Sequence, residues 1–227
     1  MAHVPDDLRA GVQATLPLLL GATPFGVVAG VAAVDAGLSP AQAVGLSMVV
    51  FAGASQLAAV DLLAQDAPLA VVVLTAVVIN LRMSMYSASI APYFESIRRR
   101  WEAVCAYLLT DMSYALAIAE FTENRDTDRR WYYLGAAATI WAVWQVATIA
   151  GVVLGASIPE SWGVSFAVPL VFLALLVPEL SDRPRVVAAL VGGSVAVLGA
   201  GWPLNLGLLG GALAGVVAGV VAEGRNA

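Results

Sequence analysis

The chain has 227 residues, of which 60% are hydrophobic and only 12% are charged, and its formal net charge is −5. A soluble domain carries roughly 25% charged residues, so this composition leaves too little charge to cover a globular surface. The acidic balance also argues against nucleic-acid binding, which needs a basic patch. We therefore expect a polytopic integral membrane protein made only of α-helices, with one transmembrane domain over residues 1–227.

Missing residue types exclude several kinds of chemistry. All 11 basic residues are arginines, so Schiff-base and P-loop lysines are absent. The sole histidine is His3, in the N-terminal tail, and the sole cysteine is Cys105, which excludes histidine relays, disulfides and iron–sulfur sites. Asp111 is the only carboxylate at the centre of an apolar segment, so paired-aspartate proteolysis has no second group. We expect no metal, no cofactor and no enzymatic activity.

Apolar stretches of about 20 residues predict the membrane-spanning helices. Eight such segments follow one another in chain order, at 12–34, 41–63, 69–90, 103–121, 132–155, 164–179, 185–201 and 204–222. The number falls to seven if the two short segments, 164–179 and 185–201, do not both cross the membrane.

The first segment carries Pro24, Phe25 and Gly26 near its middle. Proline removes a backbone donor and disturbs the preceding turn, so we expect an interrupted helix here. Broken helices expose N–H and C=O groups at the bilayer midplane, where they bind carboxylates, ammonium groups or cations. The alternative is a simple kink, because proline and glycine are common in membrane helices.

The second segment begins at a capping box, with Ser39 before Pro40. Its middle contains Gly53, Ser55 and Gln56, which predict a second interruption and a candidate binding site. The alternative for Ser55 and Gln56 is hydrogen bonding between neighbouring helices.

The third and fourth segments carry charge at membrane depth, where each ionisable group costs about 2.5–3.5 kcal/mol. Asn80 and Arg82 lie in the third segment, and Asp111 lies in the fourth. Arg82 suits a two-pronged bond to a carboxylate, and Asp111 can bind an ammonium group, carry a proton or neutralise Arg82. The structural alternative is an ion pair between the two, or an arginine that reaches the membrane interface.

A weak internal repeat relates the first segment to the fifth. Residues 26–30 read Gly-Val-Val-Ala-Gly, and residues 151–155 read Gly-Val-Val-Leu-Gly. Such a repeat would relate the first three segments to segments five to seven, in a 3+1+3 arrangement of a kind that is common in transporters.

The distribution of arginine predicts the orientation of the chain. With eight spans, seven arginines lie on one side and three on the other, which favours both termini in the cytoplasm. The seven are Arg9, Arg125, Arg129, Arg130, Arg183, Arg185 and Arg225, and the three are Arg98, Arg99 and Arg100. The run at 98–100 conflicts with that orientation.

The last segment has glycines at four-residue spacing, which form a smooth ridge for close helix packing. They are Gly207, Gly211, Gly215 and Gly219. The packing partner is either another helix of this chain or another subunit.

The polar pieces of the first four segments resemble the AzlC family of branched-chain amino-acid permeases. In chain order these pieces are Pro24-Phe25-Gly26, Gly37-Leu38-Ser39, Phe51-Ala52-Gly53-Ala54-Ser55-Gln56, Asn80-Leu81-Arg82, Tyr86-Ser87-Ala88-Ser89-Ile90-Ala91-Pro92 and Thr110-Asp111-Met112-Ser113-Tyr114-Ala115. They cover residues 12–121, whereas the C-terminal half matches only in hydropathy and length. Met112 stands where the family often has a second acidic residue, a departure that bears on how transport is coupled.

The resemblance implies a secondary transporter that exports leucine, isoleucine, valine and analogues across the cell membrane. It also implies a small hydrophobic partner subunit of the AzlD type. The substrate carboxylate would go to Arg82 or to a half-helix N-terminus, and its ammonium group to Asp111 or to backbone carbonyls. The alternative is a non-transporting membrane scaffold that assembles through its glycine ridge.

Overall fold

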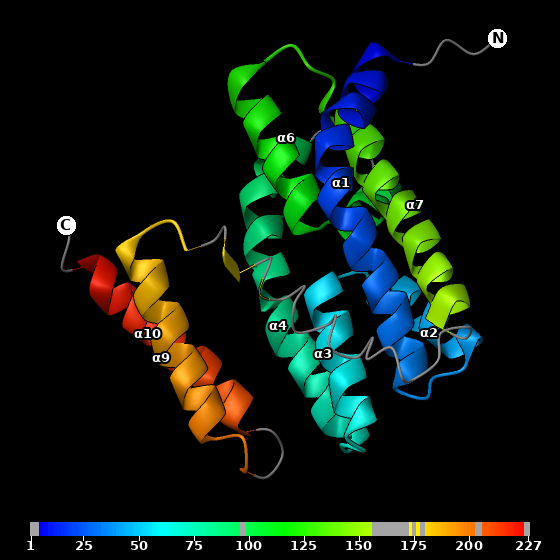
Figure 1. Cartoon of the computed structure of the whole chain (residues 1–227). Helices are drawn as coiled ribbons and strands as arrows, with labels where there is room; N and C mark the ends of the chain where they lie inside the picture. The colour runs from blue at the N-terminus through cyan, green and yellow to red at the C-terminus, as the bar shows by residue number, and fades with distance from the viewer. Residues whose placement is uncertain are drawn as a thin grey trace.

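The computed structural model describes residues 5–95, 99–155, 173, 176–177, 180–202 and 206–224. Every regular element in these ranges is helical (Figure 1). Within the described chain, four helical stretches are long and apolar enough to cross a membrane, namely α1 (Asp6–Asp35), α4 continued by η1 (Leu69–Phe94), α7 (Arg129–Gly155) and α10 (Leu206–Gly224). The predicted all-helical membrane fold is confirmed. The predicted segment 164–179 lies almost entirely outside the described residues.

Helix α1 runs without interruption through Pro17 and Pro24, so the interruption expected at Pro24 is wrong. Proline removes one hydrogen bond from a helix, but membrane helices tolerate it where neighbouring groups support the freed backbone. In this fold α7 packs along α1 from one end to the other and holds it as a single helix.

Helices α1 and α7 run parallel and touch through glycines. Near the start of both helices Gly135 faces the carbonyl of Leu8, and further along Gly151 faces the carbonyl of Val27. A Cβ atom at either glycine would collide with backbone, so glycine permits this close approach. The two similar sequence pieces, which open with Gly26 and Gly151, lie in this contact. The wider 3+1+3 repeat stays a prediction, because much of its second half lies outside the described residues.

The segment 41–63 forms two half-length helices instead of one spanning helix. Helix α2 (Pro40–Val49) starts at the capping box of Ser39, and α3 (Gly53–Ala64) starts after a break at residues 50–52. The chain reverses at this break, and α3 returns to the end of the bundle where α2 begins (Figure 1). Hydropathy is the same for a spanning helix and for such a hairpin, which is why the sequence predicted a span.

The course of helix α4 (Leu69–Ile90) shows from which end of the bundle the α2–α3 hairpin enters. The short helix η1 (Ala91–Phe94) continues from α4, and the ring of Phe94 lies edge-on to Tyr133, with 5.2 Å between ring centroids. Tyr133 belongs to the first turns of α7. Helix α4 therefore ends where α1 and α7 begin, and the loop between α3 and α4 lies at the opposite end of the bundle.

The segment 103–121 is also split, and α5 (Arg99–Tyr107) and α6 (Asp111–Glu123) form a second half-length hairpin. The expectation of a single spanning helix is wrong here because Thr110 and Ser113 form a capping box that starts a new helix. This hairpin enters from the end where α4 finishes, so the two hairpins point toward each other from opposite ends (Figure 1).

The opposed hairpins gather arginines at one end of the bundle, which we call the arginine end. It contains Arg9, Arg99, Arg100, Arg125, Arg129 and Arg130. The conflict over residues 98–100 came from counting 41–63 and 103–121 as crossings. Since neither hairpin crosses, Arg99 and Arg100 lie on the same side as Arg9.

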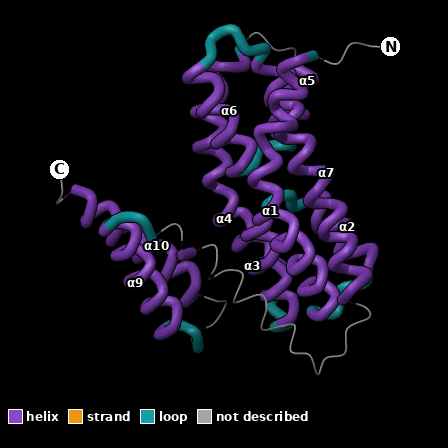
Figure 2. Tube along the Cα trace, turned by 45° about the horizontal axis from the view of Figure 1, so that its top comes forward, coloured by secondary structure: helices purple, strands orange, loops and turns teal. Residues whose placement is uncertain are grey.

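Helices α9 (Arg183–Leu198) and α10 pack mainly on each other as an antiparallel pair (Figure 2). The glycine ridge of α10 lies in this contact. Gly207 faces Gly199, Gly211 faces Gly192 and Ala196, Gly215 faces Ala188 and Gly192, and Gly219 faces Ala188. The ridge is thus used within the chain, and the scaffold alternative loses the feature on which it depended.

Candidate functional site

The tips of the two hairpins meet at mid-height of the bundle. The hydroxyl of Tyr107, at the end of α5, donates to the carbonyl of Met48, at the end of α2, over 2.8 Å. The rings of Phe51 and Tyr107 are 6.3 Å apart, and Trp141 of α7 donates its indole N–H to the Tyr107 hydroxyl over 2.9 Å. Backbone that leaves helical geometry at membrane depth is tolerated only inside protein or beside a cavity.

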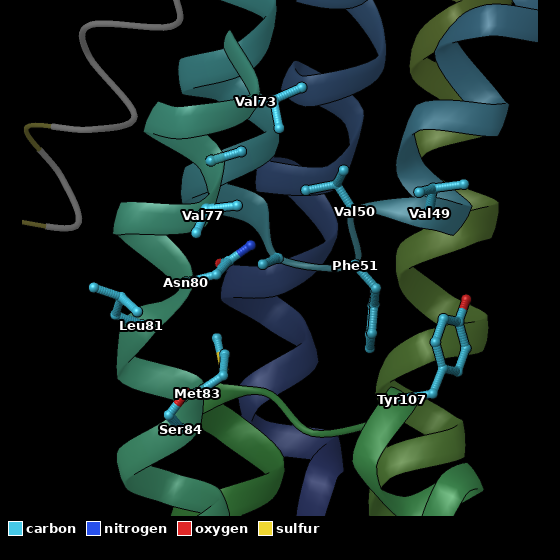
Figure 3. Close-up of a pocket in the computed structure, with 12 residues that line it drawn as sticks. Val49, Val50, Phe51, Val73, Val77, Asn80, Leu81, Met83, Ser84 and Tyr107 are labelled. Carbon is cyan, nitrogen blue, oxygen red and sulfur yellow. The ribbon is translucent and has the colours of Figure 1, made fainter. Parts of the chain in front are cut away.

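A groove with a volume of about 580 Å³ lies between α4 and these tips (Figure 3). Its walls are Val49, Val50, Phe51, Ala52, Val73, Ala76, Val77, Asn80, Leu81, Met83, Ser84 and Tyr107. Nine of these twelve residues are apolar, and the polar ones are Asn80, Ser84 and Tyr107. In Figure 3 the side chain of Asn80 points from α4 toward the α2–α3 tip. The groove therefore offers a mostly aliphatic lining with a few polar groups at the midplane.

The residues at the start of α3 lie deep in the bundle. A Cβ on Gly53 would meet the rings of Phe25 and Trp144, and Ser55 donates to the carbonyl of Ala52 over 3.0 Å. Gln56 is completely buried, and neither atom of its amide has a hydrogen-bond partner among the described residues.

Arg82 and Asp111 form an ion pair between α4 and the first residue of α6, with 3.1 Å between Nη1 and Oδ2. Their side chains are 34% and 47% exposed on the surface of the chain. Beside the pair, Tyr86 stacks on Tyr114 with 4.5 Å between ring centroids, and the Tyr114 hydroxyl bonds Ser89 over 2.8 Å. The ion pair left open by the sequence is present in the structure, and Arg82 does not line the groove.

The groove, the start of α3 and the Arg82–Asp111 pair, which together we call the centre, contain most of the unpartnered polar atoms of the described residues. Buried side-chain atoms without a hydrogen bond, in the part of the chain that the structure describes, are Gln56 Nε2 and Oε1, Asn80 Oδ1, Arg82 Nε, Asp111 Oδ1, Gln145 Oε1 and Thr148 Oγ1. Such atoms are rare in folded proteins because each loses its hydration without compensation. Four of these six residues are site residues that the sequence predicted, so the centre holds spare hydrogen-bonding capacity for a ligand or water.

Other predicted site residues lie outside the groove. Pro24 is exposed on α1, Phe25 packs edge-on against Trp144 at 5.4 Å, and Gly26 faces Ala147 of α7. Phe25 lies next to Gly53 at the start of α3, and none of the three residues lines the groove.

Tyr107 and the two valines of the α2–α3 tip, Val49 and Val50, line the groove but were not predicted from the sequence. Tyr107 lies just before the Thr110–Ser113 capping pattern, and that pattern is the signal that could have revealed the second tip. Among the described residues, no group of three or more His, Cys, Asp or Glu side chains could hold a metal ion.

Comparison with known proteins gives one family and several relatives. The family described as AzlC protein matches residues 17–158. An inner membrane protein of Escherichia coli (strain K12), YgaZ, is 27% identical over 82% of this chain and 80% of its own length. A protein of Archaeoglobus fulgidus described as an uncharacterized membrane protein is 31% identical over 91% of both chains, and one of Helicobacter pylori is 24% identical over 81% of this chain and 80% of its own. No solved structure matches this chain.

Proposed function

Because the chain belongs to the AzlC family, whose members are transport-related membrane proteins, we propose that it is the large subunit of a secondary exporter of branched-chain amino acids. The observation that carries this proposal is the mid-height groove, which combines aliphatic walls with the polar side chains of Asn80, Ser84 and Tyr107 and lies beside the facing ends of α2 and α3. Transporters hold their substrates near the bilayer midplane in such places.

The chemistry of the groove favours leucine, isoleucine and valine over polar amino acids. Val73 and Val77 of α4 face Val50 and Phe51 across the groove, and a branched aliphatic side chain buries its surface well against them. A charged side chain would lose its hydration there without a partner. The substrate is therefore a small amino acid with an apolar side chain.

The Arg82–Asp111 pair is the group that we propose for ion or proton coupling. Protonation of Asp111 would cancel its charge and release Arg82, so the pair has two states that a proton gradient can bias. This role requires no cofactor and no ATP-binding motif in the chain.

The exposure of the Arg82 and Asp111 side chains supports the proposal that a partner subunit covers them. Charged side chains at mid-height of a spanning helix are costly in lipid, yet a third of Arg82 and nearly half of Asp111 lie open on the surface. We propose that a small hydrophobic subunit of the AzlD type covers this face of α4 and α6 in the cell membrane.

The arginine end is the end that we assign to the cytoplasm. Cytoplasmic loops carry an excess of arginine and lysine, and the opposite end of the bundle carries Asp35, Asp61 and Asp66 with no arginine among its described residues. The N-terminus is then cytoplasmic, and we propose the same side for the C-terminus.

Efflux of preloaded, labelled leucine, isoleucine and valine from cells tests the proposal. The wild-type chain is expressed alone and together with a candidate AzlD-type subunit. The Arg82→Ala variant of the chain is expressed together with the same subunit. We expect faster efflux only with both subunits and an intact Arg82, dependent on the proton gradient. Absence of efflux under every condition, from protein shown to be inserted, would contradict the exporter and return the scaffold to consideration.

A further inference from the structure

Two half-length helices begin at mid-height, and their N-termini differ. The first turn of α6 is capped: Ser113 donates its backbone N–H to Thr110 Oγ1 over 3.3 Å, and Thr110 donates its own to Ser113 Oγ over 2.8 Å. The first turn of α3 has Ala52 at the N-cap position, and no side chain caps it. Its backbone N–H groups thus keep the capacity to bind an anion.

Gln56 adds a second, independent sign of a ligand at this N-terminus. Its side chain is 0% exposed, and both amide atoms lack a partner among the described residues. Leaving a buried amide unpaired costs about 1–3 kcal/mol of folding stability. Gln56 therefore destabilises the protein unless a ligand or water binds its amide. Residues four apart share a face of a helix, and helical side chains lean toward its N-terminus, so Gln56 lies on the same face of α3 as Ala52 at the uncapped end.

The aliphatic groove reaches the same point. Ala52 and Phe51 form part of its wall, and Asn80 faces them from α4 with its Oδ1 atom buried and unpartnered (Figure 3). Val49 and Val50 also line it, so the C-terminal end of α2 lies beside the N-terminal end of α3. A helix C-terminus attracts cations, as a helix N-terminus attracts anions.

We propose that the α2–α3 tip is the recognition site for the amino-acid zwitterion. The carboxylate accepts hydrogen bonds from the first-turn N–H groups of α3 and from the Gln56 amide. The ammonium group lies between the C-terminal end of α2 and Asn80 Oδ1, and the aliphatic side chain lies along the valines of α4. This inference rests on the proposed function in taking an amino acid as the substrate, and it leaves the Arg82–Asp111 pair free for coupling.

Two substitutions test the site, because each should weaken leucine binding without lowering the stability of the protein. Ala52→Asp supplies a side-chain carboxylate that caps α3 and occupies the site, and Gln56→Leu replaces an unpaired amide by an apolar group of similar size. In both variants we expect leucine affinity to fall at least about tenfold while the melting temperature stays equal or rises. A variant that merely unfolds would lose both.

Matched controls come from groups that already have hydrogen-bond partners. Thr110→Ala uncaps α6, and Tyr133→Phe removes a buried hydroxyl that donates to the Cys105 carbonyl over 2.9 Å. We expect both controls to lower the melting temperature and to keep leucine affinity in the folded protein. Leucine affinity that is unchanged in Ala52→Asp and Gln56→Leu would overturn the inference.

Binding to purified protein in lipid nanodiscs is measured with labelled leucine, and with 4-methylpentanoate and leucinamide as competitors. 4-Methylpentanoate is leucine without its ammonium group, whereas leucinamide keeps the ammonium group and lacks the carboxylate. We expect 4-methylpentanoate to compete better than leucinamide in the wild type, and to lose that advantage in Gln56→Leu. If leucine is not exported by cells but 4-methylpentanoate binding depends on Gln56, the exporter fails and the carboxylate site stands. If leucine is exported but neither variant changes its binding, the site fails and the exporter stands.

Discussion

The hydroxyl of Tyr107 joins two hairpins that enter the bundle from opposite ends, because it donates to the carbonyl of Met48 over 2.8 Å. The same hydroxyl accepts the indole N–H of Trp141 over 2.9 Å. One side chain thus connects α5, α2 and α7 at mid-height and satisfies a carbonyl that the last turn of α2 leaves open. The position of the groove depends on this contact, since Tyr107 is also part of its wall.

Replacing Tyr107 by phenylalanine should loosen the contact between the hairpins. The ring stays, and two hydrogen bonds are lost, each with a net value of about 0.5–1.5 kcal/mol. We expect a lower melting temperature in detergent and slower efflux. Tyr93→Phe is the matched control, because Tyr93 contributes ring contacts to Phe121 and Arg129. Equal melting temperatures for the two variants would contradict a structural role for the Tyr107 hydroxyl.

Single cysteines should distinguish half-length hairpins from spanning helices. In a Cys105→Ser background, we expect Asp35→Cys and Gln65→Cys to react with a membrane-impermeant thiol reagent from the same side. Glu95→Cys and Asn124→Cys should react only from the other side, because the α5–α6 hairpin returns to the arginine end.

Eight spanning segments predict a different labelling pattern. With two true crossings at 41–63 and 103–121, Gln65→Cys would share its side with Asn124→Cys, and Glu95→Cys would share its side with Asp35→Cys. That pattern would show that the hairpins do not form in the membrane. Labelling in permeabilised cells is the control for accessibility.

The sequence was sufficient for the membrane class and for the existence of the long helices, although α1 begins at Asp6, six residues before the predicted start. Apolar length marks α1, α4, α7 and α10, and the Ser39 capping box marks the start of α2. The two hairpins were not predicted, because hydropathy averaged over a window of residues does not show where the chain reverses its direction. The capping pattern from Thr110 to Ser113 was visible in the sequence and marks the second reversal.

Part of the site was also predictable, since the cost of burying polar groups selects the same residues in sequence and structure. Gln56, Asn80, Arg82 and Asp111 were chosen for that cost, and the structure places unpartnered buried atoms on all four. The groove itself was not predictable, because Tyr107 reaches it only through the contact between the two hairpins.

The glycine contacts between α1 and α7 give a prediction about assembly of the bundle. A Cβ on Gly151 would collide with the Val27 carbonyl, whereas nothing lies within 4 Å of a Cβ on Gly21 of α1. We expect Gly151→Ala to lower the melting temperature strongly and to reduce the yield of folded protein. Gly21→Ala should be neutral or stabilising by up to about 1 kcal/mol, because alanine favours the helix. Similar melting temperatures for both variants would mean that α1 and α7 are less tightly packed than the structure has them.

The Arg82–Asp111 pair allows its structural and transport roles to be separated. Arg82→Gln and Asp111→Asn each leave one unpaired charge at membrane depth, so each single variant should lower both the melting temperature and efflux. The double variant removes both charges and should regain most of the melting temperature, since its remaining side chains are neutral. We expect its efflux to stay at least about tenfold below wild type, because no group remains to take up a proton.

The thermal unfolding and efflux of all four proteins form a double-mutant cycle for this pair. The exposed pair of Asp182 and Arg185 at the start of α9, at 3.3 Å, is the control. Its double variant, Asp182→Asn with Arg185→Gln, should change neither quantity, because exposed ion pairs contribute little. Recovery of efflux together with stability in the Arg82→Gln/Asp111→Asn protein would mean that the central pair only holds α4 to α6, and that coupling resides elsewhere.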